Sequence, residues 1–400
     1  MRDPHISRYL HKHAEPQTIA YASQVTRHYA RSVVIPTYDE ASDCISNVFQ
    51  HNNSSDTLVI AVVNAPDNAA PAPLARTRTL LKEISSANPQ HLLVIDCVSP
   101  GLTLAAKSGV GLARKLGTDI ALQLYVDNKI GSPWIYQTDA DAVLPADYFS
   151  AKLSGVGAVV FGHTHVSSDP HLACAARLYD LHMTHYWNGL KAAGSSYAYP
   201  TLGSTIAVHV RAYASVRGYP KRNAGEDFYL LNKIAKVAGV VHQPKTQIEL
   251  QARASSRVPF GTGPALAKIC AGLASDPTGQ FYLSYHPASF TLLAQALTYL
   301  QNFAENLRVP SDLSANTEKI AAILNTLRFD KVRLTIAGKY NSTERRGEIL
   351  QQWFDAAKTL RFIHEARRFY ADQPLLEILE KTANPAKKSG QELSSKRPKT

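Results

Sequence analysis

The sequence of 400 residues predicts an α/β fold, in which a mostly parallel sheet flanked by helices is followed by a helical region. Two observations lead to this fold class. Short β-branched runs alternate with helical patterns through the first 210 residues. After residue 280 the apolar residues recur at helical spacing, as in Phe290, Leu293, Leu297 and Leu300. Apolar content of 45% and charged content of 19% are typical of a globular protein.

Six segments read as strands: residues 32–36, 57–63, 91–95, 134–138, 157–161 and 205–210. The first three are almost continuously apolar, as expected of parallel strands that are buried on both faces. Helical patterns over residues 104–116 and 171–192 lie between the strands. Strands that alternate with helices indicate right-handed crossover connections.

We expect four parts along the chain: an N-terminal extension (1–31), an α/β domain (32–264), a helical accessory region (265–381) and a basic disordered tail (382–400). The tail is polar and has no apolar residues that could anchor it to a core.

The formal net charge of +11 invites a nucleic-acid interpretation. Much of the excess lies at the two ends, since residues 1–31 and 382–400 together carry ten basic and three acidic residues. We therefore expect no specific nucleic-acid partner. No apolar run approaches the ~20 residues of a membrane helix, so we expect no transmembrane segment, although peripheral membrane contact stays open. Four scattered cysteines without a C-x-x-C pair favour a reducing compartment, the cytoplasm.

Polar residues follow several of the predicted strands, at the point where each strand ends. They are Thr37, Tyr38, Asp39, Glu40, Asn64, Asp96, Asp139 and Asp141. In an open α/β sheet, ligands bind at the carboxyl ends of the strands, so this edge is the candidate site. Asp139 and Asp141 are one residue apart, and two carboxylates that close repel each other. A cation is the usual partner that offsets this cost.

Two later features extend this candidate site. Gly203 and Ser204 precede the last predicted strand, and Glu226 and Asp227 stand where a helical stretch begins. A carboxylate in the first turn of a helix is stabilised by the helix dipole. It is also held on a firm support, which suits a positioned base.

Four motifs in this order resemble the family 2 glycosyltransferases of the GT-A fold. They are SVVIPTYDE (32–40), KSGVGLARKLGTDIA (107–121), YQTDADAVLPADYF (136–149) and the stretch from GSTIAVHV to GEDFYLLNK (203–233). The resemblance covers about residues 32–257. Each motif is weak by itself, but four at plausible spacings are specific together.

The resemblance implies a metal-dependent and inverting enzyme that uses a UDP- or GDP-sugar donor. Asp139 and Asp141 would hold Mn²⁺ or Mg²⁺, and Asp227 would be the catalytic base, supported by Glu226. The nucleotide-sugar-binding residues would be Pro36, Thr37, Tyr38, Glu40, Asn64, Arg114, Asp139, Gly203, Ser204 and Arg257. The acceptor hydroxyl could belong to a glycan, a lipid-linked molecule or a small molecule.

The sequence departs from this family in two places. Asn64 stands where an aspartate often reads the base, and residues 242–253 lack a suitable third, histidine ligand for the metal. Two other interpretations stay open: a non-catalytic relative that binds nucleotide sugars or polyanions, and a nucleotidyltransferase of similar fold. The histidines at 163, 165, 182 and 185 could form a second metal site, line an acceptor pocket or simply pack; His163 and His165 would share a strand face, His182 and His185 a helix face.

Overall fold

The computed structural model describes residues 3–52, 55–87, 90–254, 261–308 and 315–383. The chain divides into two compact units, and each is described by itself. The first is Met1–Ser168 with Tyr199–Pro264, and the second is Asp169–Ala198 with Ala265–Thr400. The division is not linear along the chain, because residues 169–198 belong with the C-terminal helices. From residue 384 on, the predicted tail lies outside the described residues.

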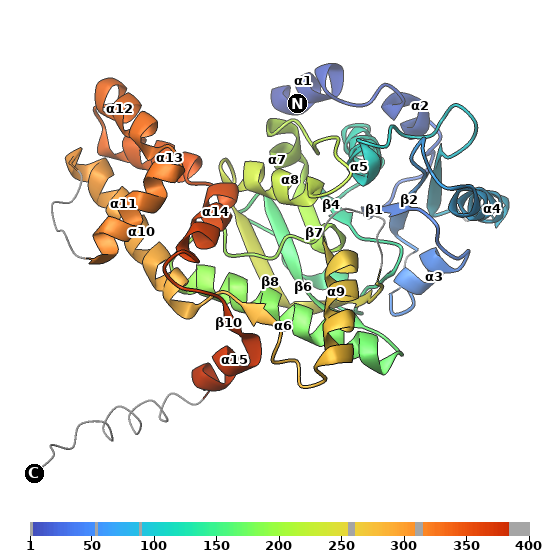
Figure 1. The fold of residues 1–400 in the computed structure, drawn as a ribbon. Helices are drawn as coiled ribbons and strands as arrows, with labels where there is room; N and C mark the ends of the chain where they lie inside the picture. Colours follow the sequence, from blue (N-terminus) through green and yellow to red (C-terminus); the bar gives the residue numbers. More distant parts are fainter. Residues whose placement is uncertain (1–2, 53–54, 88–89, 255–260, 309–314, 384–400) are drawn as a thin grey trace, which may run out of the picture. The chain divides into compact units, whose positions relative to one another are not determined.

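The first unit is built on a sheet of eight strands in the order β3-β2-β1-β4-β7-β6-β8-β5 (Figure 1). The strands are β1 (Arg31–Thr37), β2 (Thr57–Asn64), β3 (Leu92–Cys97), β4 (Trp134–Gln137), β5 (Ala142–Val143), β6 (Ala158–Val166), β7 (Ile206–His209) and β8 (Val240–Gln251). All except β7 and β5 run in one direction. The predicted α/β class, with a mostly parallel sheet flanked by helices, is confirmed.

Each of the six predicted strand segments coincides with an observed strand, namely β1, β2, β3, β4, β6 and β7. Sequence analysis did not predict β8 as a strand, because its first half is polar and contains Pro244. Its second half alternates, with Thr246, Ile248 and Leu250 buried. This alternation is the period-2 pattern of a strand with one buried face.

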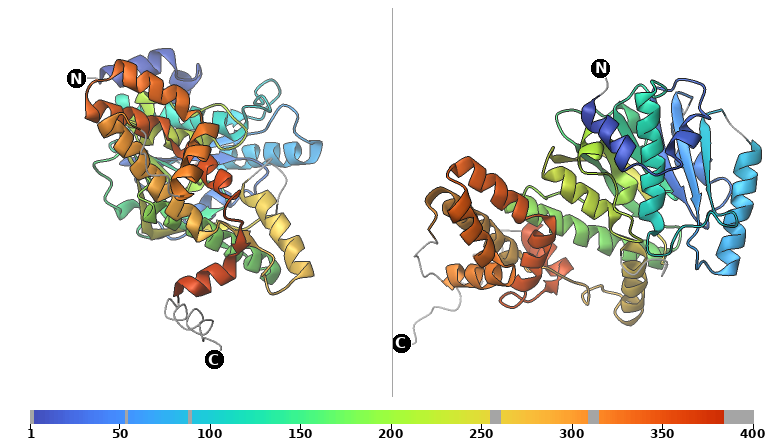
Figure 2. Two further views of the ribbon diagram at one scale, coloured as in Figure 1. Left: turned by 60° about the vertical axis from the view of Figure 1, so that its left-hand side comes forward. Right: turned by 90° about the horizontal axis from the view of Figure 1, so that it is seen from above.

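The two faces of the sheet are covered by different helices. Helix α5 (Gly109–Val126) lies along β1 and β2 (Figure 2). Gly117 of this helix faces Val34 and Val62. A Cβ at Gly117 would lie 2.4 Å from a methyl carbon of Val34, so only glycine permits this close packing. On the opposite face, Val33 and Ile35 pack in a core with residues of α3 (Cys44–Val48) and α4 (Pro71–Ala87). Alternate residues of β1 therefore serve two separate cores.

Helix α5 starts later and ends later than the predicted helical segment 104–116. Leu104 forms a parallel bridge with Pro66, and residues 105–108 turn before the helix begins at Gly109. The helix then continues to Val126, because the residues from Gly111 to Leu122 are almost all buried and the whole middle of the helix is covered.

Four further described helices belong to the first unit. They are α1 (Pro4–Lys12), α2 (Thr18–Ala22), α7 (Val210–Ser215) and α8 (Glu226–Ala235). Gly225 precedes α8 in the left-handed conformation, with φ of 69°, which is readily adopted by glycine. This turn sets Glu226 and Asp227 in the first turn of α8.

The second unit is mainly helical. Its elements are α6 (Pro170–Ala192), α9 (Thr262–Ser275), β9 (Leu283–Ser284), α10 (Pro287–Asn306), α11 (Ala315–Thr326), α12 (Phe329–Lys339), α13 (Thr343–Trp353), α14 (Ala356–Ala366), β10 (Gln373–Pro374) and α15 (Leu375–Ala383). Its core is formed largely by α10, together with residues of α11 and α14, and Leu293 and Phe362 are fully buried. None of the described helices combines the length and the apolar character that crossing a membrane requires.

Candidate active site

The Asp139–Asp141 loop lies at the carboxyl edge of the sheet, directly after β4. The backbone N–H of Thr138 donates to the carbonyl of Val34, so β1 holds the chain up to the residue before Asp139. The loop then enters β5, which pairs with the far end of β8. The two aspartates are thus supported from both sides and stand at the edge where ligands of α/β sheets bind.

Arg114 of α5 joins the two acidic motifs. Its Nη2 donates to Oδ1 of Asp139 at 2.5 Å, and its Nε donates to Oε1 of Glu226 at 3.0 Å. The arginine side chain is only 3% exposed and both acceptors are carboxylates, so these are charge-assisted hydrogen bonds from a buried guanidinium. Arg114 therefore links two candidate residues, Asp139 and Glu226, that are far apart in the sequence.

Gly203 makes room for this arginine. A Cβ at position 203 would lie 2.5 Å from Nη2 of Arg114 and 2.8 Å from its Cζ. The guanidinium thus passes directly over the glycine backbone. Ser204, next to it in the short 3₁₀ turn Gly203–Thr205, is buried. Glycine is needed at this position because it has no side chain, which lets the Arg114 guanidinium approach the backbone closely.

Asp227 has the electrostatic setting of a base. Burial and the adjacent Glu226 raise the pKa of Asp227 to about 7, against the lowering effect of a hydrogen bond from the backbone N–H of Phe228 at 2.7 Å. Burial also raises the pKa of Glu226, while its ion pair with Arg114 lowers it. A carboxylate whose pKa is close to neutrality can accept a proton efficiently.

The pKa of Asp141 is also raised. Burial, Asp139 and Glu40 raise the pKa of Asp141 to about 7, although the nearby Arg253 lowers it. The side chain of Asp141 keeps 27% exposure. Negative charge is therefore in excess around this loop, which is the condition under which a bound cation would stabilise the carboxylates.

Arg253 is a residue of this site that sequence analysis missed. It follows β8, and its Nη1 donates to both carboxylate oxygens of Glu40 at 2.8 Å. Its Nε lies 3.8 Å from Oδ2 of Asp141. The candidate chosen from the sequence, Arg257, lies outside the described residues. The alternating pattern in the second half of β8 could have identified the strand that leads to Arg253, but it does not indicate which strand β8 pairs with.

The loop after β1 is anchored in a way that the sequence did not indicate. Asp39 has a φ of 58°, its backbone N–H donates to Thr77, and its carboxylate pairs with Arg76 at 2.6 Å. Thr37 is fully buried and its hydroxyl donates to the backbone carbonyl of Ile35. Pro36 lies within β1 itself, and the side chains of Tyr38 and Glu40 are partly buried in the loop.

Asn64 ends β2, next to this loop. Its amide Nδ2 donates to the backbone carbonyl of Val62 at 3.0 Å and to that of Thr37 at 3.4 Å. The amide nitrogen thus helps to fix the residues that lead into the β1 loop. The predicted base-reading role of Asn64 stays a prediction.

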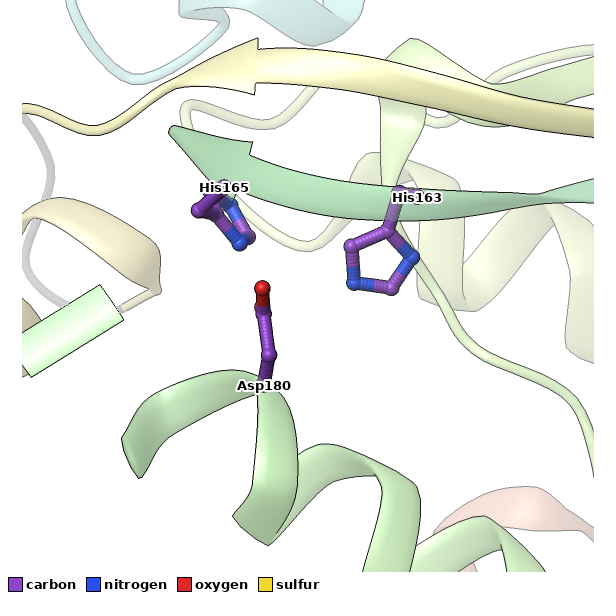
Figure 3. Close-up of side chains that lie close together, drawn as sticks. All are labelled: His163, His165 and Asp180. Atoms are coloured by element: carbon purple, nitrogen blue, oxygen red, sulfur yellow. The ribbon is translucent and has the colours of Figure 1, made fainter. Parts of the chain in front are cut away.

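His163 and His165 both project from β6 in the first unit, as Figure 3 shows. Their ring centroids are 5.5 Å apart, so the expectation that they share one strand face is confirmed. Asp180, the third side chain labelled in Figure 3, lies on α6 and belongs to the second unit.

His182 and His185, which also lie on α6, have structural partners within the second unit. His182 Nδ1 forms a hydrogen bond with Ser284 Oγ at 2.9 Å, and His185 Nε2 with the carbonyl of Tyr285 at 2.8 Å. Burial lowers the pKa of His182 to about 4 and also lowers the pKa of His185. Both rings are therefore neutral at physiological pH, and these contacts favour the packing interpretation for this pair.

No family model and no curated protein matches the chain. Among solved structures the chain is similar to one described as the crystal structure of GalNAc-T7 with UDP, GalNAc and Mn²⁺. The TM-score is 0.36 at 11% sequence identity, and the match covers 80% of this chain and 64% of that chain. A likeness of this extent is too small to assign a fold or a function.

Proposed function

We propose that this protein is a glycosyltransferase of the GT-A type, similar to family 2, which moves a sugar from a UDP- or GDP-sugar to an acceptor hydroxyl. The observation that carries the proposal is the Arg114 cluster. One buried arginine holds both the first aspartate of the D-x-D loop and the glutamate beside Asp227, so the loop that would bind the donor and the helix start that would supply the base are held by one side chain.

The donor would bind along the carboxyl edge of the sheet. The loop after β1, from Pro36 to Glu40, and Asn64 would line the nucleotide pocket, and Gly203 and Ser204 would face the sugar side. Arg114 would keep Asp139 oriented toward the donor ribose. The acceptor, whether a glycan, a lipid-linked molecule or a small molecule, would approach Asp227.

A divalent cation, Mn²⁺ or Mg²⁺, fits the residues that are present. Asp139 uses Oδ1 for Arg114, and within the described residues no hydrogen bond is found at its Oδ2. Asp141 has an elevated pKa because it is buried beside other carboxylates. Both residues therefore offer hard oxygen ligands. When bound, such a cation would neutralise negative charge on the leaving nucleoside diphosphate.

Asp227 would act as the general base of a single displacement. The acceptor oxygen would form a bond to the anomeric carbon as its proton passes to the carboxylate of Asp227. The bond between the anomeric carbon and the diphosphate oxygen would break on the opposite side, which inverts the configuration. With a pKa of about 7, roughly half of the Asp227 carboxylates are ionised at neutral pH and can accept this proton.

The test is to incubate the full-length protein with a panel of UDP- and GDP-sugars and Mn²⁺ or Mg²⁺, and to follow release of the nucleoside diphosphate. We expect turnover that is lost with a chelator and strongly reduced in Asp141→Asn. Turnover that is equal in all of these conditions would refute the metal role of Asp141.

The same assay separates the two other candidates. A nucleotidyltransferase would instead consume a nucleoside triphosphate and a sugar phosphate and release pyrophosphate. A non-catalytic relative would bind nucleotide sugars with no turnover of any of them. The position of the acidic start of α8 on Arg114, beside Asp139, favours the glycosyltransferase over a purely binding protein, because a binding site alone needs no base.

A further inference from the structure

Strand β8 delivers Arg253 to the D-x-D loop. Ala142 pairs with Leu250 and Val143 with Glu249 in the antiparallel β5–β8 ladder. The backbone N–H of Gln251 then donates to the carbonyl of Asp141 at 3.0 Å. The register of this ladder fixes where the chain goes next, and two residues beyond Gln251 is Arg253.

Arg253 forms its side-chain hydrogen bonds, among the described residues, at one edge of the guanidinium only. Its Nη1 is used by both oxygens of Glu40, each at 2.8 Å. Its Nε lies 3.8 Å from Asp141, beyond hydrogen-bond distance. In the described part of the chain, Nη2 forms no hydrogen bond, and the side chain keeps 36% exposure. The guanidinium is thus fixed in direction by Glu40, and its other N–H groups remain available to a ligand.

This arrangement suits one class of ligand. A guanidinium presents its N–H groups in a planar fork that matches two oxygens of a phosphate group. Its position beside Asp141 is also the position that the proposed cation and the donor diphosphate would share. We infer that Arg253 binds the diphosphate of the nucleotide-sugar donor, and that Glu40 is a positioning residue that acts through Arg253. This inference rests on the proposed function and specifies its donor site.

The role given to Glu40 differs from simple lining of the nucleotide pocket. If Glu40 contacted the nucleoside, its removal would weaken binding of the nucleoside itself. If Glu40 orients Arg253, its removal weakens only the contribution that the phosphates make to binding. Glu40→Gln keeps the shape of the side chain and removes the charge that holds the guanidinium, so this variant distinguishes the two roles.

The experiment is calorimetric titration of UDP, GDP, uridine and guanosine into the full-length protein in the presence of Mn²⁺. The variants are Arg253→Ala, Arg253→Lys and Glu40→Gln. Arg211→Ala is the matched control, because it also removes one arginine from an ion pair, with Asp3, and Arg211 is 66% exposed. Thermal unfolding of each variant reports whether it is folded, and Arg253→Lys keeps the charge if the alanine variant does not fold.

For the nucleoside diphosphate that the wild type binds, we expect Arg253→Ala to weaken affinity about 10- to 100-fold, the range for loss of charge-assisted hydrogen bonds. Arg253→Lys should lie between the wild type and Arg253→Ala. Glu40→Gln should also weaken binding of the diphosphate, while the affinity for the nucleoside changes less than about 3-fold in all variants. Arg211→Ala should behave as the wild type.

Three results would overturn the inference. If the wild type and Arg253→Ala bind the diphosphate equally, Arg253 has no such role, while the proposed function stands. If Arg253→Ala loses nucleoside and diphosphate binding to the same extent, Arg253 supports the whole pocket and does not bind the phosphates. If the wild type binds neither UDP nor GDP, the inference and the proposed function both fail.

Discussion

Two neighbouring residues of α5, Arg114 and Lys115, belong to two buried polar clusters of opposite character. Lys115 donates to Asp119 at 2.7 Å, and Asp119 also accepts from Tyr9 at 2.5 Å and from Tyr213 at 2.8 Å. A backbone N–H from Glu15 completes the set. In this cluster each buried charge has its opposite charge and its hydrogen bonds, so the cluster is closed.

The Arg114 cluster is open by comparison. Arg114 faces Asp139 and Glu226, with Asp227 adjacent, so negative charge exceeds positive charge. Within the described residues, Nη1 of Arg114 and the hydroxyl of Tyr219 are buried without a hydrogen-bond partner. Tyr219 is within electrostatic range of this same group. An excess of charge and unused donors is what a site for substrate requires, and what a structural cluster avoids.

The comparison teaches that burial alone does not identify a functional group. The side chains of Asp119 and Lys115 are as buried as that of Arg114, with exposures of 0%, 5% and 3%. What differs is whether the partners are complete within the protein. We therefore expect variants of the closed cluster to lose stability and variants of the open cluster to lose activity.

The largest effect should come from Asp227→Asn in the open cluster. The amide keeps the shape of the side chain and removes the basic oxygen, so transfer should fall by about 10²- to 10⁴-fold. Steady-state transfer measures this loss, and calorimetric titration of the donor should show little change. Glu226→Gln is the matched control and should be milder. Near-normal transfer by Asp227→Asn would show that another group is the base.

In the closed cluster, Lys115→Met should cost about 3–5 kcal/mol of unfolding free energy, because it leaves the carboxylate of Asp119 buried without its cation. Urea denaturation measures the change. The double variant Lys115→Met with Asp119→Leu should recover part of the loss, because it removes the stranded charge as well. If Lys115→Met is as stable as the wild type, the closed cluster does not have the structural role assigned to it.

Gly203→Ala tests whether the position of the Arg114 guanidinium in the open cluster matters. The added methyl group would lie 2.5 Å from Nη2 of Arg114, so the guanidinium must shift away from Asp139. We expect destabilisation of about 1–3 kcal/mol, as for other overpacked sites, together with a larger relative loss of transfer. Gly338→Ala is a suitable control, because a Cβ there meets nothing within 4 Å. Unchanged transfer would mean that the position of Arg114 is not critical.

The sequence was sufficient to predict those parts of this site that lie within one short stretch of the chain. The apolar strands, the aspartates after β4 and the acidic start of α8 each follow from a short pattern, and the structure brings Asp139 and Glu226 together on Arg114. Arg253 could not be found in this way. Its place depends on pairing between β5 and β8, which are about 110 residues apart in the sequence, and no local pattern encodes that register.

The same limit applies to the closed cluster. Lys115 and Asp119 form an i,i+4 pair that is visible on a helix, but an exposed pair and a buried one look alike in sequence. Residues that are distant in the sequence, Tyr9 and Tyr213, cover this pair. The N-terminal segment was expected as an extension, and its contacts with α5 were not foreseen.

The last and smallest effect concerns the pH dependence of stability. The pKa of Asp227 is raised from 3.8 to about 7 in the folded protein by burial and by Glu226. Between these values the folded state holds a proton that the unfolded state has lost. Stability from this group is therefore present at low pH and is lost as the pH rises toward 7.

Asp227→Asn removes this titration, so its unfolding free energy relative to the wild type should increase as the pH rises from 4 to 7 and then level off. The slope should be on the order of 1 kcal/mol per pH unit, close to the maximum for one proton. Urea denaturation of both proteins at several pH values between 4 and 8 measures it. The same series on Lys115→Met should show no such rise relative to the wild type, because that variant leaves Asp227 intact. A flat difference between Asp227→Asn and the wild type would show that Asp227 is ionised throughout, and the open cluster would then lack a base poised near neutral pH.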